Sequence, residues 1–210
     1  MTPRKPEAPR DVLSRGAAAI LGRSLTGTET DLFGKYLDLL VKWQKSQRLV
    51  GSSEPGWIVE NLLLDSLLFL LVLPESVSSV LDLGSGAGVP GIAIKIVRPD
   101  VGLVLVESRR RRASFLSAVI RDLGLVDARV LAGRAEDLVG ESASPVDAVV
   151  MRCAGDLQTL VPVAARLVSK AGIVVASGPP DARPTVLGEW VTVQDRARGR
   201  PRRFLVYRQT

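Results

Sequence analysis

The spacing of apolar residues predicts that the first third of the chain is helical. Five large side chains recur at intervals of three or four positions and therefore share one helical face: Leu32, Tyr36, Leu39, Leu40 and Trp43. Thr28 or Thr30 is expected to cap this helix, with Asp31 near its positive end. A second apolar helix should follow the turn at 51–56 and end at Pro74, which cannot continue a helix.

After Pro74 the pattern changes to short apolar runs separated by helical segments. The runs predict strands at 80–83, 103–107, 129–131, 147–151 and 173–176, and helices at 91–97, 111–123 and 157–168. Two alternating segments near the C-terminus, 190–193 and 203–207, predict further strands. Strands that alternate with helices are typical of βαβ units. We therefore expect an α/β fold with a mostly parallel sheet and helices on both faces.

The same pattern predicts how the chain is divided. Residues 1–10 are Pro-rich and charged and are expected to form a disordered tail, followed by an N-terminal helical cap at 11–74 and the ligand-binding domain at 75–210. The apolar stretch 62–73 is about half a membrane span and contains Asp65, so it predicts a buried helix. Because no targeting signal is visible, we expect a cytoplasmic protein with no membrane partner. We also expect a monomer.

The residue types that are missing exclude several chemistries. The chain has no histidine and a single cysteine, Cys153. An internal disulfide framework and a Cys/His zinc site are therefore excluded, and so is any nucleophile activated by histidine. We expect no bound metal.

A glycine loop is the main candidate for ligand binding. The loop follows the strand that contains Asp82. It has glycine at every second position, Gly84, Gly86 and Gly88, and it ends with Val89 and Pro90. Glycines let a backbone turn tightly and let a ligand approach it closely. A dinucleotide-binding loop would need glycine at Val89, and Pro90 removes an N–H group that would hold a pyrophosphate. The loop therefore favours a cofactor without phosphates, S-adenosylmethionine, over a nicotinamide dinucleotide.

Two charged residues at later strand ends extend this candidate site. Glu107 follows Gly88 by 19 residues, where a carboxylate in this architecture binds ribose hydroxyls, although it could instead cap the next helix. The loop at 133–137 is placed to flank an adenine. Arg152 ends the fourth strand, where it can pair with the carboxylate of a methionine group or with a nucleotide phosphate.

The charge of the chain favours a nucleic-acid partner. The net charge is +6, with 22 Arg against 6 Lys. Arginine binds phosphate in a bidentate manner, although a solvated surface encoded by a GC-rich genome would give the same composition. We expect the stretch 198–203 to bind RNA more than 109–112, which can be partly occupied by internal ion pairs. The candidates are Lys42, Lys45 and Arg48 on one helical side, Arg109 and Arg110, and Arg198, Arg200, Arg202 and Arg203.

Longer motifs carry a family resemblance over roughly residues 30–210. They are Asp82-x-Gly84-x-Gly86-x-Gly88-Val89-Pro90-Gly91-Ile92, then Ile96-Val97-Arg98-Pro99, Arg134-Ala135-Glu136 and Arg152, with Tyr36-x6-Trp43 and Leu64-Asp65-Ser66-Leu67 upstream. In these motifs the chain resembles the bacterial ribosomal RNA small-subunit guanine-N7 methyltransferases, the RsmG or GidB family.

The resemblance implies a fold, a cofactor and a reaction. The fold is that of a Rossmann-like class I methyltransferase with a seven-stranded sheet and an N-terminal helical cap. The reaction is methylation of one guanine N7 in 16S (small-subunit) ribosomal RNA, free or in a ribosomal particle. No general base is required, because N7 carries a free lone pair and proximity supplies the rate gain. The implied S-adenosylmethionine contacts are Gly84, Val89, Ala135, Glu136 and Arg152, with Glu107 at the ribose; Asp82, Gly86 and Gly88 complete the predicted site.

The chain departs from the family pattern at 44–49, at 60–62 and at Ser177, all in regions expected to face the RNA. These departures keep other functions open. One is a small-molecule methyltransferase, which would need an enclosed apolar pocket. Another is a non-catalytic RNA-binding or cofactor-sensing protein of the same fold. A nicotinamide-dependent oxidoreductase is disfavoured by Val89.

Overall fold

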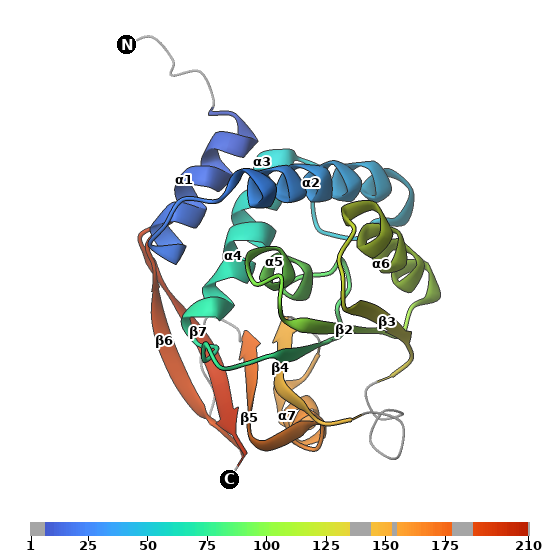
Figure 1. Cartoon of the computed structure of the whole chain (residues 1–210), viewed down its shortest axis with the longest axis vertical. Coiled ribbons are helices and arrows are strands. Elements are labelled where there is room, and N and C mark those ends of the chain that lie inside the picture. The colour runs from blue at the N-terminus through green and yellow to red at the C-terminus, as the bar shows by residue number, and fades with distance from the viewer. Residues whose placement is uncertain (1–6, 135–143, 153–154, 178–186, 210) are drawn as a thin grey trace.

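A seven-stranded sheet runs through the centre of the computed structural model, which describes residues 7–134, 144–152, 155–177 and 187–209 (Figure 1). The order of the strands across the sheet is β3-β2-β1-β4-β5-β7-β6. In chain order the strands are β1 Ser79–Leu83, β2 Gly102–Glu107, β3 Ala128–Ala132, β4 Val146–Arg152, β5 Val168–Ser177, β6 Glu189–Asp195 and β7 Arg200–Arg208.

The sheet is mixed, so the expectation of a mostly parallel sheet is only partly right. The pairings β3-β2, β2-β1, β1-β4 and β4-β5 are parallel, whereas β7 runs antiparallel to both β5 and β6. The two C-terminal strands are joined by a short turn, which permits only an antiparallel pair. In that turn the Asp195 carboxylate accepts hydrogen bonds from the N–H groups of Ala197 and Arg198.

Most helices of the described chain precede the sheet or cross over between its first strands. The α-helices are α1 Pro9–Leu21, α2 Gly27–Gln47, α3 Pro55–Ile58, α4 Leu64–Leu67, α5 Gly91–Val97, α6 Arg110–Leu123 and α7 Leu157–Ala165. A π-helical turn, η1 Val59–Leu63, joins α3 to α4, and a 3-10 turn, η2 Leu68–Leu71, follows α4. None of the described helices is both long and apolar enough to cross a membrane.

Several predicted boundaries differ from the structure, and the second predicted helix is divided into α3, η1, α4 and η2. Helix α1 begins at Pro9, inside the segment expected to be a tail, whereas residues 1–6 lie outside the described residues. Helix α7 ends at Ala165 and not at Val168, because Val168 already belongs to β5 and pairs with Val146. A residue that completes a strand pairing is not available to extend the preceding helix.

The alternation of side chains along the strands separates two hydrophobic cores. On one face, Val80, Leu105 and Val150 pack with α1, α2, α4, α5 and α6 in a cluster that extends from Leu13 to Val206. On the other face, Leu81, Val104, Val149 and Val174 pack with Val161 and Ala164 of α7. The N-terminal helices therefore share one continuous core with the sheet, and Figure 1 shows α2 lying over α6.

Helix α2 begins one turn earlier than the sequence pattern suggested. The N-cap is Thr26, whose side chain accepts a hydrogen bond from the Glu29 N–H, while the Glu29 carboxylate accepts one from the Thr26 N–H. This capping box satisfies two N–H groups at the helix start. Thr28 and Thr30 lie inside the helix, so the expectation that one of them is the cap was wrong.

We predict that Thr26→Ala lowers the free energy of unfolding by about 1 kcal/mol, since it removes the capping side chain. Chemical denaturation followed by circular dichroism measures this change. Thr28→Ala is the matched control, because Thr28 is exposed in the first turn, and its effect should stay within about 0.5 kcal/mol. Equal losses in the two variants would contradict the cap assignment.

Candidate functional site

The candidate site is a cavity of about 740 Å³ at the carboxyl ends of β1 and β4. In this sheet β1 lies between β2 and β4, at the point where the strand order reverses, and ligands of open α/β sheets bind at such a point. The cavity walls come from the glycine loop, the segment after α2, the α3–α4 segment and the β6–β7 turn. They include Leu49, Gly51, Trp57, Asn61, Asp65, Gly84, Gly86, Val89, Arg112, Arg152, Arg198, Arg200, Arg202 and Arg203.

The glycines of the loop serve two different purposes. Gly88 has φ +89°, and a Cβ there would lie 2.5 Å from Ile92 Cδ1 and 2.9 Å from the Tyr36 hydroxyl. A Cβ on Gly91 would lie 2.8 Å from Asp82 Oδ2. These two glycines permit close packing. A Cβ on Gly86 would meet nothing nearer than 3.7 Å, so this part of the loop borders open space in the cavity.

Five amide groups of the loop already donate hydrogen bonds within the protein. The N–H groups of Gly84 and Ser85 both donate to the Val106 carbonyl at 2.9 Å. The Gly86 N–H donates to Glu107, and those of Gly88 and Val89 donate to the Ser85 carbonyl. A pyrophosphate site requires N–H groups that point at the ligand. The loop therefore suits a cofactor without phosphates, and its geometry argues against a dinucleotide.

Asp82, near the end of β1, supports the segment that follows the glycine loop. It is fully buried, and its Oδ2 accepts a hydrogen bond of 2.8 Å from the Gly91 N–H at the start of α5. Burial raises the pKa of this carboxyl to about 7, against the opposing effects of the Gly91 N–H and of Arg152. The cavity lining does not include Asp82. It does not include Glu107 either, so a ligand contact of either carboxylate stays a prediction, while the Asp82 side chain fixes the start of α5.

Glu107 connects the loop to the next helix. Its Oε2 accepts a hydrogen bond of 2.9 Å from the Gly86 N–H, and its Oε1 accepts one of 2.8 Å from the Arg109 N–H at the N-cap of α6. The side chain is buried. Each carboxylate oxygen has a second lone pair, so a ribose hydroxyl can still be accommodated. The contact of Glu107 with a ribose stays a prediction.

Tyr36 supports the glycine loop, although the sequence placed it only on a helical face and in the upstream family motif. Its hydroxyl is buried and donates a hydrogen bond of 2.6 Å to the Ala87 carbonyl in the glycine loop. Burial raises the pKa of this hydroxyl well above its usual value. Helix α2 thus holds the loop on the side opposite to the sheet. No local signal points to this contact, which joins residues 51 positions apart.

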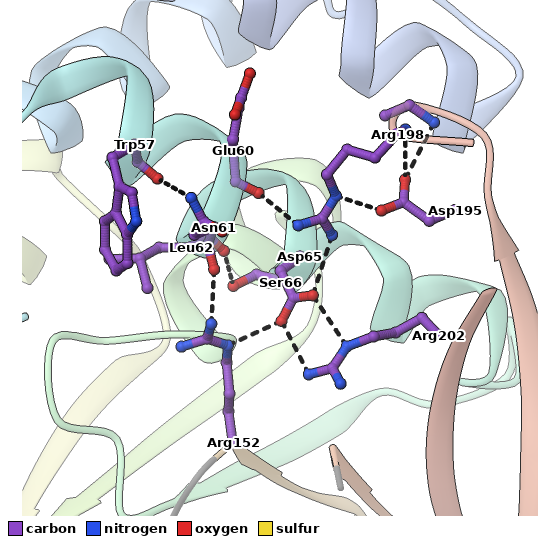
Figure 2. Close-up of polar contacts among 11 residues, drawn as sticks. Trp57, Glu60, Asn61, Leu62, Asp65, Ser66, Arg152, Asp195, Arg198 and Arg202 are labelled. Carbon is purple, nitrogen blue, oxygen red and sulfur yellow. Dashed lines mark hydrogen bonds and ion pairs between the residues drawn. The ribbon is translucent and has the colours of Figure 1, made fainter. Parts of the chain in front are cut away.

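Asp65 in α4 is bound by three arginines from the other end of the chain (Figure 2). Arg152 Nε donates to Asp65 Oδ2 at 3.0 Å, Arg202 Nε to Oδ1 at 3.0 Å, and Arg198 Nη2 to Oδ1 at 3.1 Å. Arg198 also pairs with Asp195. We call these five residues the Asp65 network. It joins α4 to the ends of β4 and β6 and to β7.

The Asp65 network also binds the backbone of the π-helical turn η1, as Figure 2 shows. Arg152 Nη2 donates to the Asn61 carbonyl at 2.6 Å, and Arg198 Nη1 donates to the Glu60 carbonyl at 3.0 Å. The Ser66 hydroxyl donates to the Leu62 carbonyl at 2.6 Å. Single π-helical turns are rare and concentrate at functional sites. Here side-chain donors fix the turn at the wall of the cavity.

The network leaves the cavity positively charged. Burial raises the pKa of Asp65, but Arg202 and Arg152 lower it more strongly, so the pKa lies below its ordinary value. Asp65 is therefore ionised at neutral pH. Three guanidinium groups still face only two carboxylates in the network, and Arg112, Arg200 and Arg203 add to the same cavity wall.

The structure corrects the expectation about which arginines are available to RNA. Arg198 and Arg202 are paired with Asp65, and their side chains are only 14% and 22% exposed. Their pairing follows from the buried carboxylate, which needs cations nearby. Arg109 and Arg110 are exposed and form no ion pair with any residue that the structure describes. The stretch at 109–112 is therefore more available than 198–203, where Arg200 and Arg203 remain exposed.

The other predicted residues fall in two groups. Lys42, Lys45 and Arg48 are exposed at the C-terminal end of α2, directly before the segment 49–51 that lines the cavity. Ala135 and Glu136 lie outside the described residues, as does Cys153. Arg152 lines the cavity, and its bonds within the protein go to Asp65 and to Asn61.

Comparisons with known proteins agree on one family. The family model described as rRNA small subunit methyltransferase G matches residues 29–178. The ribosomal RNA small subunit methyltransferase G of Sorangium cellulosum is 34% identical over 183 residues, which cover 85% of this chain and 77% of that protein. The protein of the same description from Anaeromyxobacter sp. is 36% identical over 165 residues, covering 78% and 75%.

Solved structures show the same fold at lower sequence identity. The O-methyltransferase TomG from Streptomyces achromogenes, in complex with SAM, matches with a TM-score of 0.55 and 18% identity over 85% of this chain and 90% of that chain. The putative methyltransferase yhhF from Escherichia coli matches with a TM-score of 0.53 and 20% identity, covering 68% and 83%. Likeness at this level of identity supports the fold alone.

We predict that Asp65→Asn lowers the free energy of unfolding by about 3 kcal/mol at pH 7, because it leaves buried guanidinium groups without their carboxylate. Urea denaturation of this variant, with the exposed Asp38→Asn as matched control, measures the loss.

The pKa of Asp65 is lower in the folded than in the unfolded chain. Its stabilisation is therefore complete above about pH 4, the unfolded value, and is lost as the pH falls through the folded pKa. Equal stability of the two variants at pH 7 would contradict the network.

Proposed function

Since the chain belongs to the rRNA small subunit methyltransferase G family, we propose that it transfers a methyl group from S-adenosylmethionine to N7 of a guanine in small-subunit (16S) ribosomal RNA. The family membership confirms the resemblance of its motifs. The observation that carries the proposal for this chain is the cavity itself, which joins a glycine loop with five amides already bonded within the protein to a wall with six arginines.

The cofactor is held, in this proposal, against the open side of the glycine loop. S-adenosylmethionine supplies a methyl group activated by its sulfonium. Gly86 leaves space for it, and Glu107 accepts hydrogen bonds from the ribose with the lone pairs that the Gly86 and Arg109 amides do not use. Ala135 and Glu136, which the family resemblance assigns to the cofactor, lie outside the described residues. Arg152 binds the methionine carboxylate while it remains tied to the π-helical turn.

The residues of the chain then act by position and not by proton transfer. Guanine N7 has a free lone pair, so a chain without histidine can methylate it without a general base. The increase in rate comes from holding N7 in line with the methyl group. The entropy cost of bringing the two reactants together is then met when they bind and no longer adds to the barrier of the chemical step. Tyr36, Asp82 and Glu107 serve this purpose because they make the glycine loop rigid from three sides.

The proposed partner RNA is bound by exposed basic residues around the cavity. The stretch 109–112 places four arginines at the N-terminus of α6, the positive end of the helix dipole, where cations are unfavourable. An anionic partner removes this penalty. Lys42, Lys45 and Arg48 and the exposed pair Arg200 and Arg203 extend the basic surface. A small-molecule methyltransferase would need an apolar enclosure, and six arginines in the wall disfavour it.

We predict that the purified chain transfers labelled methyl from S-adenosylmethionine to small-subunit RNA or to a particle that lacks the mark, and that the product is N7-methylguanine.

Glu107→Ala should weaken cofactor binding by about 2 kcal/mol, or roughly 30-fold, the scale for hydrogen bonds to a charged group. Glu75→Ala, at an exposed surface site, is the control. Cofactor binding without transfer to any RNA would support the non-catalytic alternative and overturn the proposal.

The salt dependence of RNA binding tests the basic surface. We predict that Arg109→Ala with Arg110→Ala reduces the slope of log affinity against log salt by roughly 0.7–0.9 for each phosphate that is no longer neutralised. Arg200→Ala with Arg203→Ala should act in the same direction. Arg121→Ala with Arg166→Ala is the matched control, because both residues are exposed and lie neither in the cavity wall nor at the N-terminus of α6. Filter binding at several salt concentrations gives the slopes, and identical slopes in all variants would exclude a role for these arginines in RNA binding.

A further inference from the structure

Trp57 is an exposed aromatic side chain in the wall of the cavity. Its exposed fraction is 37%. The other large apolar residues of the described chain that are exposed are Leu71 and Val126. Trp57 lines the cavity, whereas Leu71 and Val126 do not. A large apolar surface left uncovered inside a ligand-sized cavity indicates a binding contact rather than ordinary surface variation.

The backbone of Trp57 is fixed although its ring is uncovered. Its N–H donates to the Glu54 carboxylate that caps α3, and its carbonyl accepts a hydrogen bond of 3.0 Å from the Asn61 side chain. The π-helical turn that follows is held by Arg152 and Arg198 of the Asp65 network, as Figure 2 shows. The structure therefore holds the backbone that carries the indole from both directions along the chain. Such support is what a contact residue needs to keep its geometry.

A glycine lies beside the ring. Gly51 lies at one edge of the indole, where a Cβ would be 3.5 Å from Trp57 Cη2. Gly51 lines the same cavity, and so do Gly84 and Gly86 of the glycine loop. A flat apolar ring thus borders the cavity that also contains the proposed methyl-donor site and the arginine wall.

The aromatic ring, the proposed methyl-donor site and the arginine wall together suit the binding of an extruded nucleotide. Many enzymes that modify a base act on one that is extruded or single-stranded, and an aromatic side chain can then supply the stacking that the base has given up, while arginines hold the flanking phosphates. We propose that Trp57 is the stacking platform for the target guanine, and that it positions this base for methyl transfer. This inference rests on the proposed function. It makes Trp57 a substrate-contacting residue of the same site.

Methyl transfer under single-turnover conditions tests the inference. With saturating cofactor and RNA, Trp57→Ala should reduce the transfer rate by about 10-fold to 100-fold, the range expected when one base stack is removed. Trp57→Phe keeps an aromatic ring and should recover the rate to within about 5-fold of the wild type. RNA affinity should change little, because phosphate contacts dominate it. Leu71→Ala is the matched control, since it removes an exposed apolar side chain outside the cavity.

Calorimetry with S-adenosylhomocysteine separates the guanine from the cofactor as the partner of the ring. We expect the affinity of Trp57→Ala to stay within about 2-fold of the wild type. If that affinity falls as much as the transfer rate does, Trp57 contacts the cofactor and the inference is overturned. An unchanged transfer rate in Trp57→Ala also overturns it.

Tryptophan fluorescence gives a readout that does not depend on catalysis. A guanine stacked on an indole quenches its emission, so RNA should quench the wild type more than Trp57→Phe, in which Trp43 and Trp190 remain. If the wild type transfers no methyl group to any RNA, the proposed function fails, but this comparison still tests the stacking. Quenching that disappears in Trp57→Phe then supports a base-binding Trp57, and equal quenching in both proteins overturns it.

Discussion

The arrangement of the cavity depends on the carboxylate of Asp65. It holds guanidinium groups from Arg152, Arg198 and Arg202, which belong to segments that are remote in the chain. Removing a carboxylate from water is costly, and only well-placed partners compensate for this cost. The same arginines bind the carbonyls of η1, so the ion pairs fix the wall that contains Trp57. A structural network of charges thus determines the shape of a binding site.

Five amides of the glycine loop are already occupied by acceptors within the protein. Val106, Ser85 and Glu107 accept the hydrogen bonds that a pyrophosphate would otherwise accept. Asp82 holds the start of α5 against the loop, and Tyr36 binds the loop from α2. The N-terminal helices and the sheet are therefore joined at the loop as well as in the shared hydrophobic core. This rigidity is what a transfer that relies on orientation needs.

Two groups of arginines with similar sequence context have different roles. In the stretch 198–203, Arg198 and Arg202 bind a buried carboxylate and keep the cavity together, whereas Arg200 and Arg203 are exposed. The stretch 109–112 lies at a helix N-terminus without ion pairs in the described part of the chain, and that unfavourable charge suits an anionic partner. The number of arginines in a stretch does not tell these two roles apart. An arginine becomes structural where the fold brings it to a buried carboxylate, and it stays exposed where no such carboxylate lies nearby.

The sequence by itself determined the order of helices and strands, the glycine loop, the placement of Glu107 at the end of β2, and the absence of histidine chemistry. These features depend on local periodicity and on backbone conformations that few residues adopt, so short segments encode them. Only the tertiary structure decided that β7 runs antiparallel, that Tyr36 binds Ala87, and that Arg202 reaches Asp65 across 137 positions. Such pairs form because packing brings distant segments together, and a local pattern carries no record of which side chains will then meet.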